Sequence, residues 1–235
     1  MLFRAISAET LKYRRSPALL LAIGVPLLLD AVMWLAFTLS PHLARRWPVL
    51  ENQVSGVWAL MLLPLGIAIL ASIASGIEHS ENHLKHMLVL PPSRLDVYIA
   101  KGLGIAALVA IGAIVLVIAE LAVGLLLGFK GPLPWSDLLV KPLLASVASL
   151  PLITLGLWLG LRFRNFAIGM GVGLGGTIAG FIAARSTTYW KYVPWTYPTS
   201  ALSSSDVNLA LVLAGGVALA ILVVGALDFT LRDAP

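Results

Sequence analysis

Three of the four histidines in the chain lie close together, within the stretch 78–86. On a helix with about 100° between residues, His79, His83 and His86 share one face. Two histidines four residues apart can chelate zinc, but the zincin motif needs a glutamate directly after the first histidine, and Ser80 stands there. The pattern favours a short amphipathic surface helix whose polar face meets water or a partner. A metal site at the three histidines is the alternative.

Two carboxylates, Asp30 and Glu120, stand inside long apolar stretches. A carboxylate surrounded by hydrocarbon is costly, and such residues mark function by default. Each could line a substrate path, pair with a partner helix or bind a proton. The alternative is structural: Asp30 pairs with a buried polar group, and Glu120, nine residues before Phe129, reaches the outer interface. The sequence leaves both interpretations open.

The glycine-rich run 171–176 matches the dinucleotide-binding pattern GxGxxG, but it lies inside an apolar stretch rather than between a strand and a helix. Its spacing also matches the small-xxx-small pattern, which lets membrane helices approach closely. We therefore expect helix packing at Gly169, Gly173, Gly176 and Gly180. The chain has no Walker A motif, so we expect no nucleotide or other cofactor on it. It also lacks cysteine, which excludes disulfides and thiolate chemistry.

Long apolar helices must position these residues. Only 11% of the 235 residues are charged, about half of the roughly 25% that is usual in soluble domains. A helix that crosses the bilayer needs about 20 apolar residues. Pro26, Pro64 and Pro151 should kink their helices. The predicted fold class is an all-α polytopic membrane protein whose six spans lie near 18–39, 54–77, 102–128, 143–161, 166–184 and 207–227.

The basic residues predict the orientation. Ten of the sixteen lysines and arginines fall on the side of both termini and six on the other, which favours cytoplasmic termini by the positive-inside rule. The first span is interpreted as a retained anchor rather than a signal peptide, because it contains Asp30 and lacks a small-residue cleavage site. The net charge of +5 is distributed along the membrane flanks, so nucleic acid is not an expected partner.

The chain divides into a short amphipathic segment, 1–16, and a single transmembrane domain, 17–235. In the first segment Leu2, Phe3, Ile6 and Tyr13 share one face and basic residues the other, as expected of a helix that lies along the inner leaflet. No connection between spans exceeds about twenty residues, which leaves no room for a soluble catalytic domain. We therefore expect that the chain is not an enzyme by itself.

Three sequence elements point to a known family. They are AETLKYRRS at 8–16, the stretch 78–101 with LPPSR at 90–94 and YIAK at 98–101, and VPWTYP at 193–198. With these elements in this order, the whole chain resembles the permease subunits of type-2 ABC exporters. It is most similar to the small six-span permeases of lantibiotic and bacitracin self-protection systems.

The resemblance implies an ATP-driven permease of the bacterial cytoplasmic (inner) membrane that exports or removes an amphiphilic peptide, antibiotic or lipid-like substrate. Its partners would be two ATPase subunits, which hold ATP and magnesium, and a second permease, identical or paralogous. Residues 1–16 would be a connecting helix, and 186–205 a re-entrant or surface hairpin at the outer exit. A coupling helix within 78–94 would dock on the ATPase through Glu78, Glu81, His83, Lys85, Pro91 and Arg94. The resemblance implies no role for the histidine-bearing face.

Two rival functions stay open at this point. One is an intramembrane metal-dependent hydrolase that uses His79, His83 and a carboxylate, although catalytic histidines should lie within spans and these lie in a connection. The other is a membrane anchor or assembly subunit that transports nothing. It would show no ATP hydrolysis in a purified complex.

Overall fold

The computed structural model describes residues 6–7, 9, 11–13, 16–40, 42–80, 94–163 and 165–231, with the backbone alone at 77–80 and 94. Every regular element in this part of the chain is helical. Five helices are long and apolar enough to cross a membrane, and a sixth span results if one bent pair of helices counts as a single crossing. The predicted all-α polytopic fold is confirmed.

The first span is helix α2 (Pro17–Leu39). Its start is defined by Ser16, whose side chain accepts a hydrogen bond of 3.2 Å from the backbone N–H of Ala18. Pro17 occupies the first helical position, where its missing N–H costs nothing. Pro26 lies inside the helix, which continues without interruption through it.

The second span runs through α3 (Trp47–Val57), the π-helical turn η1 (Trp58–Leu62) and α4 (Leu63–Ser80). Pro64 lacks the N–H that would bond to the carbonyl four residues earlier, and its ring crowds that carbonyl. The helix widens just before it, and the N–H of Leu63 bonds to the carbonyl of Trp58, five residues back. The sequence predicted a kink at Pro64, and the structure has a π-turn there. The helix also begins before residue 54, the predicted start of the span.

The third span is α6 (Arg94–Leu126), which begins earlier and ends sooner than the predicted 102–128. Asp96 lies in its first turn, where a carboxylate interacts favourably with the helix dipole. Gly128 has a φ of 69°, a left-handed conformation that ends helices and that glycine adopts without strain.

The fourth span is a bent pair, α7 (Trp135–Ala148) and α8 (Leu150–Arg162), with an angle of 41° between them. Ser149 separates the two helices and Pro151 lies at the start of the second, so the predicted kink is present. Helix α7 begins at Trp135, eight residues before the predicted start of this span at 143. That extension brings Lys141 into the helix.

The last two spans are α9 (Phe166–Ala183) and α11 (Val207–Leu231). Helices α8 and α9 are joined by residues 163–165 alone, as predicted for a tight hairpin. Asn165 caps α9 by accepting a hydrogen bond of 2.9 Å from the N–H of Ala167. Helix α11 continues four residues beyond the predicted end at 227. Between these spans lie three short elements, η2 (Tyr189–Tyr192), η3 (Pro194–Thr196) and α10 (Tyr197–Ser200).

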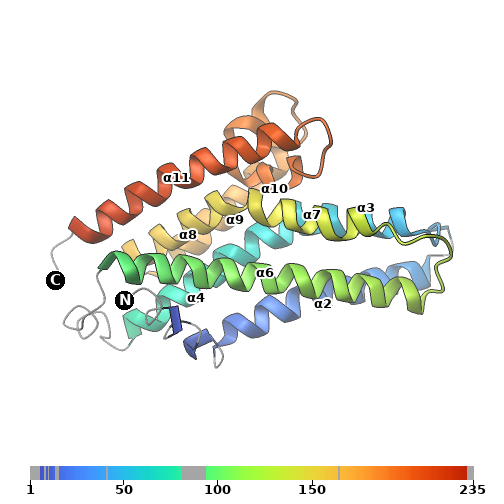
Figure 1. Ribbon diagram of the computed structural model, residues 1–235, viewed down its shortest axis with the longest axis horizontal. Coiled ribbons are helices and arrows are strands. Elements are labelled where there is room, and N and C mark those ends of the chain that lie inside the picture. Colours follow the sequence, from blue (N-terminus) through green and yellow to red (C-terminus); the bar gives the residue numbers. More distant parts are fainter. Residues whose placement is uncertain are drawn as a thin grey trace.

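The helices form an elongated bundle (Figure 1). Helix α2 packs along α6, α8 along α11, and α4 against both α8 and α9. Helices α2 and α6 begin, and α4 and α11 end, at one end of the bundle, which we call the terminal end. The opposite end, which we call the distal end, carries the connections 40–46, 127–134 and 184–206.

Candidate functional site

A buried ionic junction lies at the terminal end. The ammonium of Lys101, in α6, donates a hydrogen bond of 3.0 Å to the carbonyl oxygen of Ala74 in α4 and lies 3.6 Å from Oε2 of Glu9. Glu9 also pairs with Lys12 at 3.0 Å. The side chains of Lys101 and Glu9 are almost completely buried. The junction therefore connects the N-terminal segment to two spans at once.

Tyr13 fixes the same segment by packing. A Cβ built on Gly104 in α6 would lie 2.5 Å from Cε2 of the Tyr13 ring, so only glycine leaves room for the ring there. Lys101 and Gly104 are three positions apart and therefore lie on one face of α6. The N-terminal amphipathic segment is thus bound to α6 by the ionic contact of Glu9 with Lys101 and by the packing of the Tyr13 ring on Gly104. The sequence alone did not predict these contacts.

The predicted coupling residues surround a connection whose structure is not described. Glu78 and His79 lie in the last turn of α4, and Arg94 is the first residue of α6. The other predicted members of this set and of the histidine face, Glu81, His83, Lys85, His86 and Pro91, fall outside the described residues. In the part of the chain that is described, no group of three or more histidine or acidic side chains could hold a metal ion. The role of these residues stays a prediction.

A cluster of ionisable side chains lies near the distal end, inside the bundle. The ammonium of Lys141 in α7 lies 2.5 Å from Oε2 of Glu51 in α3 and 3.7 Å from Asp137. Glu120 of α6 interacts electrostatically with Asp30 of α2, with Glu51 and with Lys141. Four helices therefore contribute to one cluster, which we call the carboxyl cluster: Asp30, Glu51, Glu120 and Lys141.

The two intramembrane carboxylates that the sequence singled out belong to this cluster. Asp30 is 1% exposed and Glu120 2%, so Glu120 does not reach the surface. Both carboxyl oxygens of Asp30 and one of Glu120 have no hydrogen-bond partner among the residues described. The structural interpretation, in which Asp30 pairs with a polar group and Glu120 reaches the interface, is therefore not supported.

Aromatic rings pack together on the distal side of this cluster. Phe129 contacts Phe37 at a ring-centroid distance of 5.7 Å and Trp47 at 5.6 Å. The ring of Trp47 also lies where a side chain at Gly124 would be. All three rings are buried. They come from the distal ends of α2 and α3 and from the connection that follows α6.

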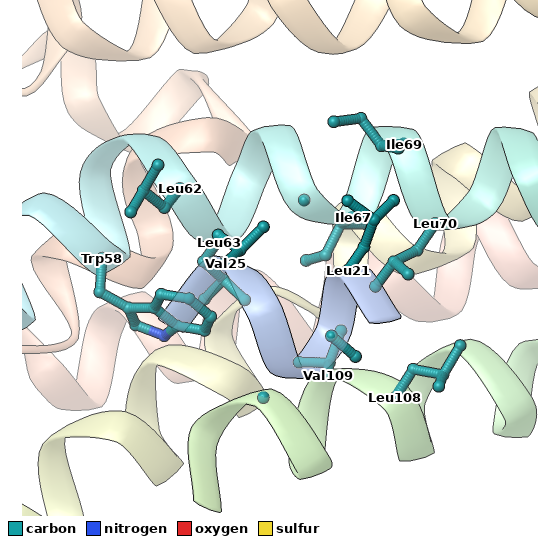
Figure 2. A pocket seen from close by; sticks show the side chains of 13 residues that line it. Leu21, Val25, Trp58, Leu62, Leu63, Ile67, Ile69, Leu70, Leu108 and Val109 are labelled. Atoms are coloured by element: carbon teal, nitrogen blue, oxygen red, sulfur yellow. The ribbon is translucent and has the colours of Figure 1, made fainter. Parts of the chain in front are cut away.

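An apolar cavity lies on the other side of the cluster, between α2, α4 and α6. Figure 2 shows Trp58 at one end of it and only aliphatic side chains beyond, from both sides of the cavity. Its volume is about 30 Å³, enough for a water-sized group. Its lining includes Ala22 and Gly112, eight residues closer to the terminal end than Asp30 and Glu120 respectively.

The glycine face of α9 packs inside the bundle. A Cβ on Gly173 would overlap the side chain of Ala68 in α4, and one on Gly169 would lie 2.9 Å from Oγ of Ser72. Gly176 and Gly180 lie against Trp195 of the distal connection. Among the residues that the structure describes, Gly171 and Gly175 meet nothing within 4 Å, so in this part of the chain one glycine stripe makes contacts and the other does not.

The distal connection 184–206 is folded against the spans. The hydroxyl of Thr196 donates to the carbonyl of Trp190 at 2.6 Å, and the hydroxyl of Tyr197 donates to the carbonyl of Lys191 at 2.9 Å. Burial raises the pKa of the Tyr197 phenol. Trp190 and Tyr197 are buried and belong to the protein core, whereas Tyr189 and Tyr192 of the same connection are exposed.

The comparison with known families decides the class of this helical bundle. A family model described as "ABC-2 family transporter protein" matches residues 5–180, about three quarters of the chain. The chain belongs to the ABC-2 transporter family. No curated protein is significantly similar to this ABC-2 chain, so its lantibiotic-type resemblance is unconfirmed. The matched range includes the terminal-end junction, the carboxyl cluster and the glycine face of α9.

Within this ABC-2 transporter chain, sequence reasoning identified Asp30, Glu120 and the packing glycines, and the structure places Asp30 and Glu120 in one cluster. The sequence did not identify Lys101, Glu51 and Lys141 as site residues, because charges at these positions are expected at the flanks of membrane spans. A signal was present for Lys101, which stands at the edge of an apolar stretch of more than twenty residues. A charge in that place can be an internal contact as well as a membrane flank.

Proposed function

We propose that this chain is the membrane-spanning subunit of an ATP-driven transporter whose ATP is hydrolysed by a separate subunit. The observation that carries the proposal is the junction of Lys101 with Glu9 and the carbonyl of Ala74. Ala74 lies near the end of α4 and Lys101 near the start of α6, and residues 81–93 connect these two helices. A force applied to that connection, or to the N-terminal segment, would therefore reach both spans together.

A separate ATPase is needed because the chain has no Walker A motif of its own. Two ATPase subunits, with ATP and magnesium, would lie beneath two permeases, identical or paralogous. Glu81, Lys85 and Arg94 supply charges for the contact, because desolvated charge pairs each matter by a few kcal/mol when one partner is removed. In this arrangement the terminal end faces the cytoplasm of a bacterial cell, in agreement with its excess of basic residues.

An amphiphilic substrate fits the apolar interior. The cavity between α2, α4 and α6 has a volume of about 30 Å³, whereas sites for drug-sized ligands occupy about 300–1,000 Å³. A substrate path must therefore open in another state or between two permeases. The π-turn at η1 and the bend between α7 and α8 are places where spans can repack, because both interrupt the regular helical ladder.

Co-purification of ABC ATPase subunits with this chain from its native host tests the proposal. The tagged chain is extracted in mild detergent, and the amount of bound ATPase is measured for the wild type, Glu81→Lys and Arg94→Glu. Lys191→Glu is the matched control, because this exposed lysine lies at the distal end. We expect each reversal in the 78–94 segment to reduce bound ATPase about tenfold or more, and the control to change nothing.

Two results would refute the proposal. One is that no ATPase co-purifies with the wild-type chain while the chain is folded and inserted. The other is full loss of function on chelation with rescue by zinc, reproduced by His79→Ala and His83→Ala, while the charge reversals have no effect. The second result would favour the metal-dependent alternative.

A further inference from the structure

Asp30 and Glu120 have no counter-charge of their own. Both are nine-tenths or more buried, and no hydrogen bond reaches either oxygen of Asp30 or Oε1 of Glu120 from the residues described. Lys141, the cation of the carboxyl cluster, lies against Glu51 at 2.5 Å and against Asp137 at 3.7 Å. Its charge is thus already offset by two other carboxylates.

The helical register brings the two carboxyls to one level. Helices α2 and α6 run in the same direction, and a Cβ on Gly112 of α6 would lie 3.2 Å from the carbonyl oxygen of Ala22 in α2. Asp30 and Glu120 each follow these residues by eight positions, or about 12 Å along parallel helices. Their electrostatic interaction agrees with this register.

No other charge in the described part of the chain faces the pair. Helix α3 contributes Glu51 and α7 contributes Lys141, with Asp137 beside it at 50% exposure. Toward the terminal end lies the apolar cavity with the Trp58 indole. Toward the distal end lie the packed rings of Phe37, Trp47 and Phe129.

An uncompensated carboxylate in such surroundings is so costly that the group gives up its charge instead. We propose that Asp30 and Glu120 form a proton-binding pair that is neutral while α2 and α6 are packed together. Each uptake adds one proton from water to a carboxylate oxygen, and each release returns that proton to water. No other bond changes. This site is independent of how the transporter is energised.

The proton-binding pair makes the packed state sensitive to pH in a defined direction. In the unfolded chain both carboxyls release their protons near pH 4. The folded chain retains them to higher pH, so above about pH 4 it binds more protons than the unfolded chain. Stability must then fall as pH rises. It levels off only where the folded chain also releases the protons.

The test uses the full chain in lipid nanodiscs, with any bound partner retained. The carbonyl stretch of protonated carboxyl groups is followed by infrared spectroscopy from about pH 5 to about pH 9, and the melting temperature is recorded over the same range. The variants are Asp30→Asn and Glu120→Gln, which imitate the protonated forms. Asp206→Asn, a carboxyl in the distal connection, is the control.

We expect a protonated-carboxyl band in the wild type that persists above about pH 7, where ordinary carboxyls are ionised. Each amide variant should lose part of this band and part of the pH dependence of melting, whereas Asp206→Asn should retain both. If an amide variant does not fold, the protonated-carboxyl band of the wild type is sufficient to test the proposal. Its absence at about pH 7 means that the two groups are anions, which overturns the proposal.

Sodium is the competing occupant of the pair. The melting temperature is therefore also compared in sodium and choline chloride at fixed pH and equal ionic strength. Equal values in the two salts support proton binding. A higher melting temperature in sodium that disappears in both amide variants would overturn the proton assignment in favour of a metal-cation site.

Discussion

The ammonium of Lys141 lies 2.5 Å from Oε2 of Glu51, ninety residues away in the sequence. The pair joins α7 to α3 near the distal end, and the amide oxygen of Asn52 also accepts from Lys141, at 3.3 Å. Glu51 is almost completely buried, whereas 19% of the Lys141 side chain is exposed. Because this ion pair is largely shielded from water, removal of one partner lowers the free energy of unfolding more than removal of both. The single removal leaves the remaining charge uncompensated.

Lys141→Met should therefore destabilise the chain by about 2–4 kcal/mol. The double variant with Glu51→Gln should recover more than half of that loss. Thermal unfolding in nanodiscs, followed by tryptophan fluorescence, measures both effects as a double-mutant cycle. Lys130→Met, at an exposed lysine, controls for the loss of a positive charge. Additive single effects would show that the ion pair contributes nothing.

The two glycine stripes of α9 offer a matched pair of substitutions. Gly173→Leu places a side chain where Ala68 already packs, and overpacking of this kind costs about 1–3 kcal/mol. Gly175→Leu, two residues further on, meets open space. We expect Gly173→Leu to reduce the melting temperature and the assembled fraction. Gly175→Leu should change neither quantity. Equal effects of the two would mean that the contact with α4 is incidental.

The membrane orientation can be tested directly, because the chain has no cysteine. Ser204 is exposed in the distal connection, and Ser80 is the last residue of α4 at the terminal end. With cytoplasmic termini, a membrane-impermeant thiol reagent on intact cells should label Ser204→Cys and leave Ser80→Cys unlabelled. Permeabilised cells provide the control for reactivity. The opposite labelling pattern would invert the topology.

Lys101 should matter for coupling more than for binding of the ATPase. Lys101→Met leaves the carbonyl of Ala74 without its donor, whereas Glu9 keeps its ion pair with Lys12, so the expected cost is about 1–3 kcal/mol. We expect ATPase to remain bound while its hydrolysis no longer responds to substrate-like lipids or peptides. Melting and co-purification are measured together with hydrolysis, and Lys191→Met is the control. Unaltered stimulation in a folded variant would remove the junction from the mechanism.

The sequence predicted the fold class well, and the structure has five or six candidate spans where six were predicted, because apolar stretches of about twenty residues are stable mainly as membrane-spanning helices. It misplaced the ends of spans wherever a charged residue continued the helix, as at Glu51, Lys101 and Lys141. Hydropathy treats each of these as a residue in water, but partners distant in the sequence keep them inside the protein. Such contacts depend on which helices are neighbours, and a single sequence does not contain that information.

The site was predictable to the same extent. A carboxylate in an apolar stretch identified Asp30 and Glu120, yet nothing in either span indicated that they meet. The spacing of Gly169 and Gly173 predicted helix packing, but not that Ser72 and Ala68 of α4 would be the contacts. Composition and spacing therefore identify the residues. The register between helices determines what these residues do together.

The proposed role of this chain is to convert ATP hydrolysis in another subunit into movement of its spans. ATP turnover by the chain and the ATPase that co-purifies with it, reconstituted together in nanodiscs, is compared with the turnover of each subunit alone. We predict turnover in the complex about tenfold or more above the ATPase alone, none from this chain alone, and loss of the increase in Arg94→Glu. Turnover that is identical with and without this chain, in a complex proven to be intact, would show that the chain is not coupled to ATP hydrolysis.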